Sequence, residues 1–543
     1  MKKVVLMTLL SAVALASADV EVSAQENWEK LARQDAMNPV APGKVGTDKP
    51  FWNGYARRFI YVPSFEFPIF EKAKKYRFTV LDAKNKVHTF DAERPDEPLT
   101  AVWDKLPVGY TTVMVTALNG KNQIIADCGS RRFYRAAPFS GNYAPALRDY
   151  RESARWALKY VFDQKHVQAW RTTGQPSRSY NLYCYPNKLI GSVITGMLFY
   201  SKISPADREA ALDIAQKAAD YLISISEKAD APLAYLPPTY MWNILSAHRF
   251  AGQIMMIYPC NAGTAYMRLY EETKNEKYRT AAIRIADTYC KLQLDNGSWH
   301  LKLWQKDGSP VVEQPKPGQP VPPPNYCAAP AISAFLQMIA ETTGDKKYQA
   351  AADRNLEYIN NTVVKTFNWE GQFEDQIPLP PYMNNTKHTA ARYAQYILAQ
   401  KGCTTADVDF ARTLLRYAED QFVVWEKPMP CYPSANLHTR EWMLPCVLEQ
   451  YSYYVPIDAS GATLIEFYMS LHKKTGNPLD LAKAKALADA ATRAQDQQTG
   501  RYFTYCEKNS RNKVAGWINC AIRTSEVMIK FADYLDSLEK NKK

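Results

Sequence analysis

Two kinds of hydrophobic spacing divide the chain. Between residues 56 and 140, apolar and polar residues alternate in short runs, at 58–62, 77–81, 87–90 and 111–116. A period of two, rich in β-branched and aromatic residues, is typical of antiparallel strands. We therefore expect a small antiparallel β-sandwich with a hairpin across residues 82–86.

Soon after Pro145 the apolar spacing changes to three and four residues, which predicts amphipathic helices. The predicted helices cover 146–162, 207–226, 262–272, 277–294, 328–343, 346–361, 389–400, 406–422, 460–474, 479–497 and 520–538. Many of them form pairs joined by a short turn, in which Gly344 or Gly476 follows the last periodic residue and ends the helix. The second half of the chain is therefore expected to consist of helical hairpins.

An aromatic residue and an Asn or Asp recur where these hairpins begin. The polar members are Asn187, Asn261, Asn325, Asn384, Asp458 and Asn519, which stand 59 to 74 residues apart. This interval suits two antiparallel helices and a loop, and a regular interval is the mark of a repeat architecture. Each pair can also be a local helix cap or hydrophobic staple; for Asp458 we expect capping rather than catalysis.

Six hairpins favour a ring that closes on itself over an open solenoid. We predict a multidomain protein, in which an N-terminal antiparallel β-sandwich within 25–144 is followed by an all-α (α/α)6 toroid within 145–543. The six polar positions and the loops 297–325, 371–385, 425–458 and 500–517 then share one face of the ring, which we call the rim.

Residues 1–24 have the pattern of a cleavable signal peptide. Lys2 and Lys3 precede an apolar stretch at 4–16, and Ala18 and Ala24 end two small-residue cleavage sequences. The apolar stretch is too short to cross a bilayer, so we expect no transmembrane segment. The expected location is the periplasm or the exterior of the cell.

Composition and charge narrow the classes of partner. The 543 residues are 46% hydrophobic and 22% charged, which is an ordinary soluble profile, and the formal net charge is +12. This charge indicates an anionic partner or a scattered surface excess. No block of Lys and Arg forms a nucleic-acid patch, and no C-x-x-C or H-E-x-x-H motif is present. We therefore expect no nucleic acid, no metal and no cofactor.

Several phrases carry a resemblance to known families. They are Asn296-Gly-Ser-Trp299, Gly371-Gln-Phe-Glu374-Asp375 and Glu449-Gln-Tyr451 ahead of Pro456-Ile-Asp458. With them, residues 146–540 resemble the (α/α)6-toroid carbohydrate-active enzymes, which include unsaturated glucuronyl hydrolases, polysaccharide lyases and glucuronyl C5-epimerases. The phrase from Ala101 to Gly109 is similar to fibronectin-like modules of secreted glycan enzymes. This resemblance implies a substrate cleft on the rim, lined by aromatic and acidic residues.

Glycoside hydrolysis usually uses one protonated and one ionised carboxyl group. The candidate catalytic residues on the rim are Glu374, Asp375, Glu441 and Glu449. Adjacent side chains diverge, so we expect Glu374 or Asp375 to act with Glu441 or Glu449. The alternative is that Glu374 and Asp375 are solvated or cap a turn.

Aromatic faces pack on sugar rings while polar neighbours bind hydroxyl groups. The candidate binding residues are Tyr185, Asn187, Asn261, Trp299, His300, Trp304, Tyr326, Tyr382, His388, His438, Arg440, Tyr451, Tyr453 and Trp517. Some of these aromatic residues can instead belong to the core. Arg440 is the candidate for a uronate carboxylate because its planar fork matches two oxygen atoms, although a surface ion pair is the alternative.

The leading hypothesis is a glycoside hydrolase, glucuronidase-like, that acts on an oligo- or polysaccharide containing uronate. A lyase or C5-epimerase on the same substrate is the second, with Tyr382, Tyr451 or Tyr453 moving a proton beside the carboxylate. A glycan-binding protein without catalysis is the third. The product distinguishes these hypotheses. A hydrolase gives a new reducing end, a lyase an unsaturated uronate, an epimerase neither of these, and a binding protein no product.

Overall fold

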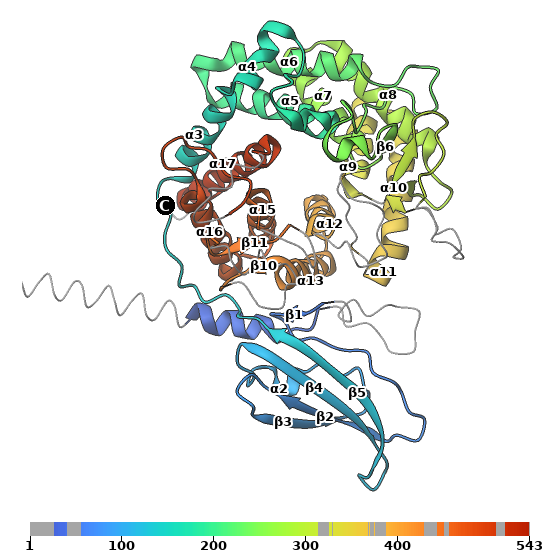
Figure 1. Ribbon diagram of the computed structural model, residues 1–543, viewed down its shortest axis with the longest axis vertical. Coiled ribbons are helices and arrows are strands. Elements are labelled where there is room, and N and C mark those ends of the chain that lie inside the picture. The colour runs from blue at the N-terminus through green and yellow to red at the C-terminus, as the bar shows by residue number, and fades with distance from the viewer. Residues whose placement is uncertain are drawn as a thin grey trace, which may run out of the picture.

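The protein is described here by a computed structural model. It describes residues 27–40, 56–312, 325–327, 329–367, 369, 374, 387–427, 442–449, 456–506 and 516–541, except the side chains of 387 and 388. A ring of helices makes up most of the molecule, and a smaller sheet module lies against one side of it (Figure 1).

The sheet module follows the alternation of the sequence. Its strands, in the order β1-β5-β4-β2-β3, are β1 (Arg58–Phe59), β5 (Ile124–Arg135), β4 (Gly109–Leu118), β2 (Lys75–Leu81) and β3 (Val87–Ala92). All neighbours are antiparallel except β1 and β5. Alternate residues such as Phe78 and Val115 are buried on one face, because successive side chains of a strand point to opposite faces. The predicted hairpin across 82–86 is confirmed as the β2–β3 turn.

The β-sandwich prediction is not confirmed. Within the described residues, this module has one sheet, and the further sheets are two-stranded and lie in loops of the helical part. Helix α2 (Thr100–Trp103) supplies cover for the buried face, where Trp103 stacks on Phe133 of β5 with 6.1 Å between ring centroids. A helix and loops therefore take the place that a second sheet would occupy.

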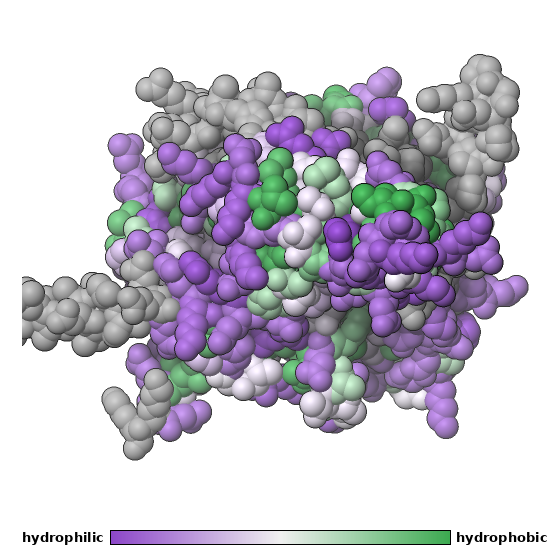
Figure 2. Space-filling model, turned by 90° about the horizontal axis from the view of Figure 1, so that it is seen from below, coloured by the Kyte–Doolittle hydropathy of each residue, from purple (hydrophilic) through white to green (hydrophobic). Residues whose placement is uncertain are grey.

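The outer face of this module is largely polar. Seen from below in Figure 2, the molecule is mostly hydrophilic with small separate apolar areas. Val87 and Ile124 are exposed, but they pair with Leu81 and Leu118, which lie at opposite ends of the sheet. The exposed apolar residues of the strands therefore do not form one continuous docking patch.

The helical part is a closed ring of six inner helices. They are α5 (Pro186–Ile203), α7 (Pro259–Thr273), α9 (Pro330–Thr343), α12 (Lys387–Ala399), α15 (Asp458–Thr475) and α17 (Ile518–Lys540). Each contacts the next, and α17 returns to contact α5. This cycle, visible in Figure 1, confirms the toroid prediction.

Each inner helix has an outer partner. In ring order these are α6 (Arg208–Ser224), α8 (Glu276–Leu292), α10 (Lys346–Tyr358), α13 (Thr405–Phe422), α16 (Pro478–Ala494) and α3 (Tyr150–Phe162). The first helix of the ring, α3, pairs with the last, α17, so the two ends of this domain close the circle. Glycines allow close contact between inner helices: a Cβ on Gly263 of α7 would come within 2.4 Å of Phe335 on α9.

Helices α4 (Lys165–Thr173) and α5 lie outside the predicted ranges, as do the short helices α2 and α11 (Val364–Thr366). Helix α5 is buried on most sides, with Leu189, Ile190, Val193 and Ile194 all inside. A helix that is apolar around most of its surface has no clear three-to-four periodicity. The predicted turns are confirmed, because Gly344 and Gly476 end α9 and α15 in the left-handed conformation.

The predicted rim coincides with the N-terminal ends of the inner helices. Tyr185, Tyr258 and Trp517 immediately precede α5, α7 and α17, and each occupies the N-cap without a side-chain cap. Asn187 and Asn261 lie inside the first turn, so neither is an N-cap. Asp458 is the first residue of α15 and accepts a hydrogen bond from the Ala459 amide at 2.7 Å, although the N-cap position is Ile457.

Buried polar groups join the sheet module to the ring. The carboxylate of Asp420 on α13 accepts hydrogen bonds from the backbone amides of Ile60 (2.5 Å) and Tyr61 (2.8 Å). Next to it, the Tyr61 hydroxyl group donates to Glu419 of α13 at 3.0 Å, and Lys483 of α16 lies 2.7 Å from the same carboxylate. These paired groups fix the position of the module, because a buried charge is tolerated only with a partner.

Two further observations concern the whole described chain. None of the helices in the described part is long and apolar enough to cross a membrane. The nine cysteines that the structure describes are free.

Candidate functional site

The candidate site on the rim is centred on a buried ion pair. Glu374 precedes α12, and its Oε1 atom lies 2.6 Å from Nζ of Lys188 in the first turn of α5. The hydroxyl group of Tyr258 donates to Oε2 of the same carboxylate, and Tyr240 donates to the Glu374 carbonyl at 2.7 Å. Three segments far apart in the sequence therefore meet at one carboxylate.

Glu374 is ionised in this setting. Burial of the side chain would raise its pKa, but the charge of Lys188 and the hydrogen bonds of Lys188 and Tyr258 outweigh burial and lower the pKa below its ordinary value. Burial likewise works to lower the pKa of Lys188, and Glu374 reverses this so that the pKa is raised. Because Glu374 is 1% exposed and both its oxygens accept hydrogen bonds, it holds Lys188 and Tyr258 in place.

An aromatic pair lies beside Lys188. The ammonium group is 4.5 Å from the ring centroid of Trp517, and Trp517 stacks on Tyr185 with 5.8 Å between centroids. The hydroxyl group of Tyr180 donates to the Gly516 carbonyl at 2.7 Å and accepts from the Ile518 amide at 3.1 Å. These bonds anchor the segment before α17, so that Trp517 is held next to a cation.

Two further carboxyl groups lie on this side of the rim. Glu449 is partly exposed and close enough to Lys188 to contribute to its raised pKa. Asp458 is buried, and burial raises its pKa to about 8, against weaker lowering by the Ala459 amide and the Thr524 hydroxyl. At neutral pH the site therefore contains an ionised carboxylate, Glu374, and a protonated carboxyl group, Asp458.

Other predicted residues form a second group on the rim. Strand β7 (Trp299–His300) pairs with β9 (Tyr326–Cys327), and His300 stacks on Tyr326, which is 47% exposed. Burial lowers the pKa of His300, so its imidazole is neutral at pH 7. Asn261 is exposed at the start of α7, and Trp304 is partly buried in β8 (Lys302–Trp304).

Three of the predicted binding residues are buried, namely Tyr185, which is 3% exposed beside Trp517, and Trp299 and Asn187, which lie in the core. Trp299 is fully buried, and its Nε1 donates to the Tyr289 carbonyl at 2.9 Å. Asn187 is 1% exposed and faces the Pro237 carbonyl at 3.4 Å. The side chains of Trp299 and Asn187 are inaccessible to a ligand, because both are packed in the interior.

The remaining predicted residues lie outside the described part of the structure. They are Asp375, Tyr382, His438, Arg440, Glu441, Tyr451 and Tyr453, together with the side chain of His388. Their roles stay predictions.

Lys188, Tyr258 and Tyr240 were not predicted as site residues. Tyr258 is the aromatic partner of Asn261 in the recurring pattern and Lys188 directly follows Asn187, and these positions were the available signal. Nothing near Tyr240 in the sequence marks it. No cluster of three or more His, Cys, Asp or Glu side chains fit to hold a metal occurs in the part of the chain that the structure describes.

Comparison with known proteins gives structural similarity alone. No protein-family model matches the sequence, and no curated protein gives a significant match. Similar solved structures include a cellobiose 2-epimerase from Spirochaeta thermophila, at 11% identity over 72% of this chain and 99% of that chain, with a TM-score of 0.47.

Two other similar structures are hydrolases by name. A family 76 glycoside hydrolase (mannosidase) from Bacteroides thetaiotaomicron has 11% identity over 73% of this chain and 100% of that chain, with a TM-score of 0.45. An unsaturated glucuronyl hydrolase from Streptococcus agalactiae has 12% identity over 70% of this chain and 91% of that chain, with a TM-score of 0.43. At these scores and identities, the similarities do not define an activity for the chain.

Proposed function

We propose that the protein is a carbohydrate-active enzyme, a glycoside hydrolase that acts on an anionic, uronate-containing glycan outside the cytoplasm. The observation that carries the proposal is the Lys188–Glu374 pair on the rim of a closed helical ring, with Trp517 packed against its cation. A cation beside an aromatic face suits a sugar that carries an acidic group.

The described groups suggest roles for the reaction. Lys188 has 20% of its side chain exposed and binds the substrate's negative charge, while Glu374 positions it. Glu449 is the partly exposed carboxyl group near Lys188 and acts on the sugar as the second carboxyl group of the reaction. Asp458 retains a proton at neutral pH and supplies it to the leaving group.

One contact favours a second candidate, a lyase or C5-epimerase. Tyr258 donates its hydroxyl proton to a carboxylate that a lysine holds in place. Such a tyrosine can exchange a proton with the carbon beside a uronate carboxylate. The product distinguishes this reaction from hydrolysis.

The test is a panel of uronate-bearing polysaccharides incubated with the protein, with products resolved by mass and absorbance. Hydrolysis predicts fragments with a new reducing end and one added water. An unsaturated product indicates a lyase, and a product of unchanged mass with altered stereochemistry indicates an epimerase. Full activity in both E374Q and D375N would refute the assignment of the site to this part of the rim.

A further inference from the structure

Arg392 lies in the second turn of α12, one of the inner helices of the ring. The neighbours of α12 in the ring are α9 and α15. The groups that act on the pKa of Arg392, however, include Tyr258 and Cys260 at the start of α7 and Arg523 of α17. A side chain of α12 approaches α7 and α17 together only when it extends toward the ring axis.

The side chain of Arg392 is exposed, yet burial among protein atoms is the largest cause that lowers its pKa. Both hold when a side chain extends into a deep, solvent-filled depression. We call this depression the axial well. Tyr258 links it to the rim, because Tyr258 both acts on Arg392 and bonds to Glu374.

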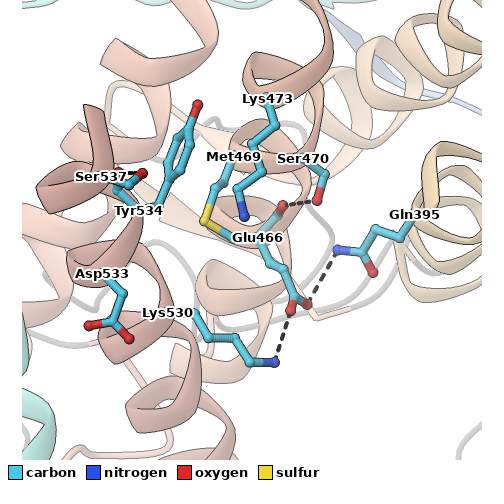
Figure 3. Close-up of a pocket in the computed structure, with 9 residues that line it drawn as sticks. All are labelled: Gln395, Glu466, Met469, Ser470, Lys473, Lys530, Asp533, Tyr534 and Ser537. Atoms are coloured by element: carbon cyan, nitrogen blue, oxygen red, sulfur yellow. Dashed lines mark hydrogen bonds and ion pairs between the residues drawn. The ribbon is translucent and has the colours of Figure 1, made fainter. Parts of the chain in front are cut away.

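A cavity of about 660 Å³ lies among α12, α15 and α17 (Figure 3). Glu466 of α15 lines it and accepts hydrogen bonds from Gln395 at 3.3 Å and Lys530 at 3.4 Å. Glu466 also bonds Arg523 and acts on the pKa of Arg392. Arg392 stands three residues before Gln395 on α12, so it lies on the same face of this helix as a residue that lines the cavity. The volume of the cavity suits one or two sugar rings.

Positive charge exceeds negative charge around the axial well. The cations are Arg392, Arg523, Lys473 and Lys530. Glu466 is shared between Arg523 and Lys530, and Asp533 is bonded to Arg151 of α3. Arg392 forms no ion pair or hydrogen bond with any residue that the structure describes, and Arg523 is the charged group with the largest effect on its pKa. Glu466, which is bonded to Arg523, acts on the same pKa more weakly.

We propose that Arg392, with Arg523 behind it, binds the carboxylate or sulfate group of an anionic glycan that enters the axial well from the rim. The inference rests on the proposed function and adds the group that the site recognises. A guanidinium presents two parallel N–H donors, which match two oxygens of a carboxylate or sulfate. An incoming anion also relieves the repulsion between the two arginines.

The first test measures anion binding without catalysis. Thermal unfolding and calorimetric titration are carried out with sodium glucuronate and with sodium sulfate, each against sodium chloride of equal ionic strength. Three proteins are compared: the wild type, R392Q, and R279Q as the matched control. Arg279 lies on the outer helix α8 and pairs with Glu276 at 3.4 Å, away from the ring axis.

Wild type and R279Q are expected to gain melting temperature with at least one anion, whereas R392Q loses this gain and binds about tenfold more weakly or worse. Without anion, R392Q is expected to melt at the same or a higher temperature, because a like-charge contact is removed. If Arg392 had only a structural role, R392Q would melt at a lower temperature than wild type. Anion stabilisation in R392Q equal to that of wild type, or none in wild type with either anion, overturns the proposal.

The two anions and an activity assay separate the remaining possibilities. Binding of sulfate alone assigns a sulfated sugar, and binding of glucuronate alone assigns a uronate; each supports the site. If anion binding depends on Arg392 but no glycan gives a product, the proposed enzyme activity is refuted and the anion site is supported. Turnover of a uronate glycan with unchanged kcat/KM in R392Q refutes the inference and retains the proposed function.

Discussion

Nζ of Lys188 lies 2.6 Å from Oε1 of Glu374, and the pair joins the first inner helix of the ring to the segment before the fourth. The carboxylate is 1% exposed, whereas the lysine keeps 20% of its side chain in contact with solvent. This asymmetry makes the lysine the member that can meet a ligand. Replacing the two residues should therefore reduce the stability of the protein by different amounts.

Replacing Lys188 by Met should destabilise the protein more than replacing Glu374 by Gln. K188M leaves a carboxylate buried without its cation, which costs roughly 3–5 kcal/mol, while E374Q leaves an ammonium that reaches water. Urea unfolding of the two variants measures the difference. Equal destabilisation would show that Glu374 is less buried than the structure indicates.

The same two variants should lose activity on an anionic glycan. Loss of the pair lets Lys188 or its replacement move away from Trp517, and a misplaced group on a reacting sugar costs roughly 100-fold in kcat/KM. The loss in E374Q should fall on kcat/KM while the fold, checked by circular dichroism, is retained. A folded E374Q with wild-type kinetics would remove the pair from the site.

Trp517 should contribute to glycan affinity. W517A removes the face that packs on Lys188 and Tyr185, so we expect KM to rise roughly tenfold with a smaller change in kcat. W517F keeps a flat ring and should recover much of the affinity. Similar losses in both variants would indicate that the indole serves packing rather than a sugar.

Asp458 should make stability depend on pH. Its pKa is about 8 in the folded protein, and an unfolded Asp titrates near about 4, so the folded state binds the extra proton between these values. The stability that Asp458 contributes is therefore full at about pH 4 and below, and it is lost as pH rises to about 8. D458N should flatten the fall in a series of urea unfolding curves.

Asp420 at the module interface contributes in the same direction, with a pKa raised by burial to about 7. The control for D458N is D533N, which changes an exposed carboxylate on α17. A difference in stability between wild type and D458N that stays constant from pH 4 to 8 would contradict the protonated state assigned to Asp458.

The contact between the sheet module and the ring should depend on Lys483. K483M removes the cation 2.7 Å from the buried carboxylate of Glu419, and we expect a loss of roughly 3–5 kcal/mol in the free energy of unfolding. The matched control is K277M, whose ion pair with Asp220 at 2.7 Å is about half exposed and should matter by less than ~1 kcal/mol. Equal effects would show that the interface pair is solvated.

The sequence predicted the ring because its hairpins repeat one signal many times. Gly344 and Gly476 end helices at the turns, and aromatic residues precede the next inner helices. Both features recur at similar intervals along the sequence. Helix α5 could not be predicted from periodicity, because apolar residues occupy most of its surface. The strands were also visible, but the sequence cannot show what covers a sheet, and here Trp103 of a short helix does so.

The site was predictable only in part. Glu374 was identified from its turn and its aromatic neighbours, and the structure places it on the rim. Arg392 carries no local signal and Lys188 only its position after Asn187, because the importance of both comes from helices that meet them across the ring. Trp299 shows the converse: an aromatic residue in a rim loop packs inward when the loop folds over the core.

The most direct test of the proposed function is the kcat/KM of the protein on a uronate polysaccharide and on the same polysaccharide after reduction of its carboxyl groups to alcohols. The two substrates share linkage, length and ring shape and differ in the charge that Lys188 and Arg392 face. We predict cleavage of the acidic polymer and a loss of about 100-fold or more on the reduced one. Equal cleavage of both polymers, or cleavage of the reduced one alone, would contradict the anionic site.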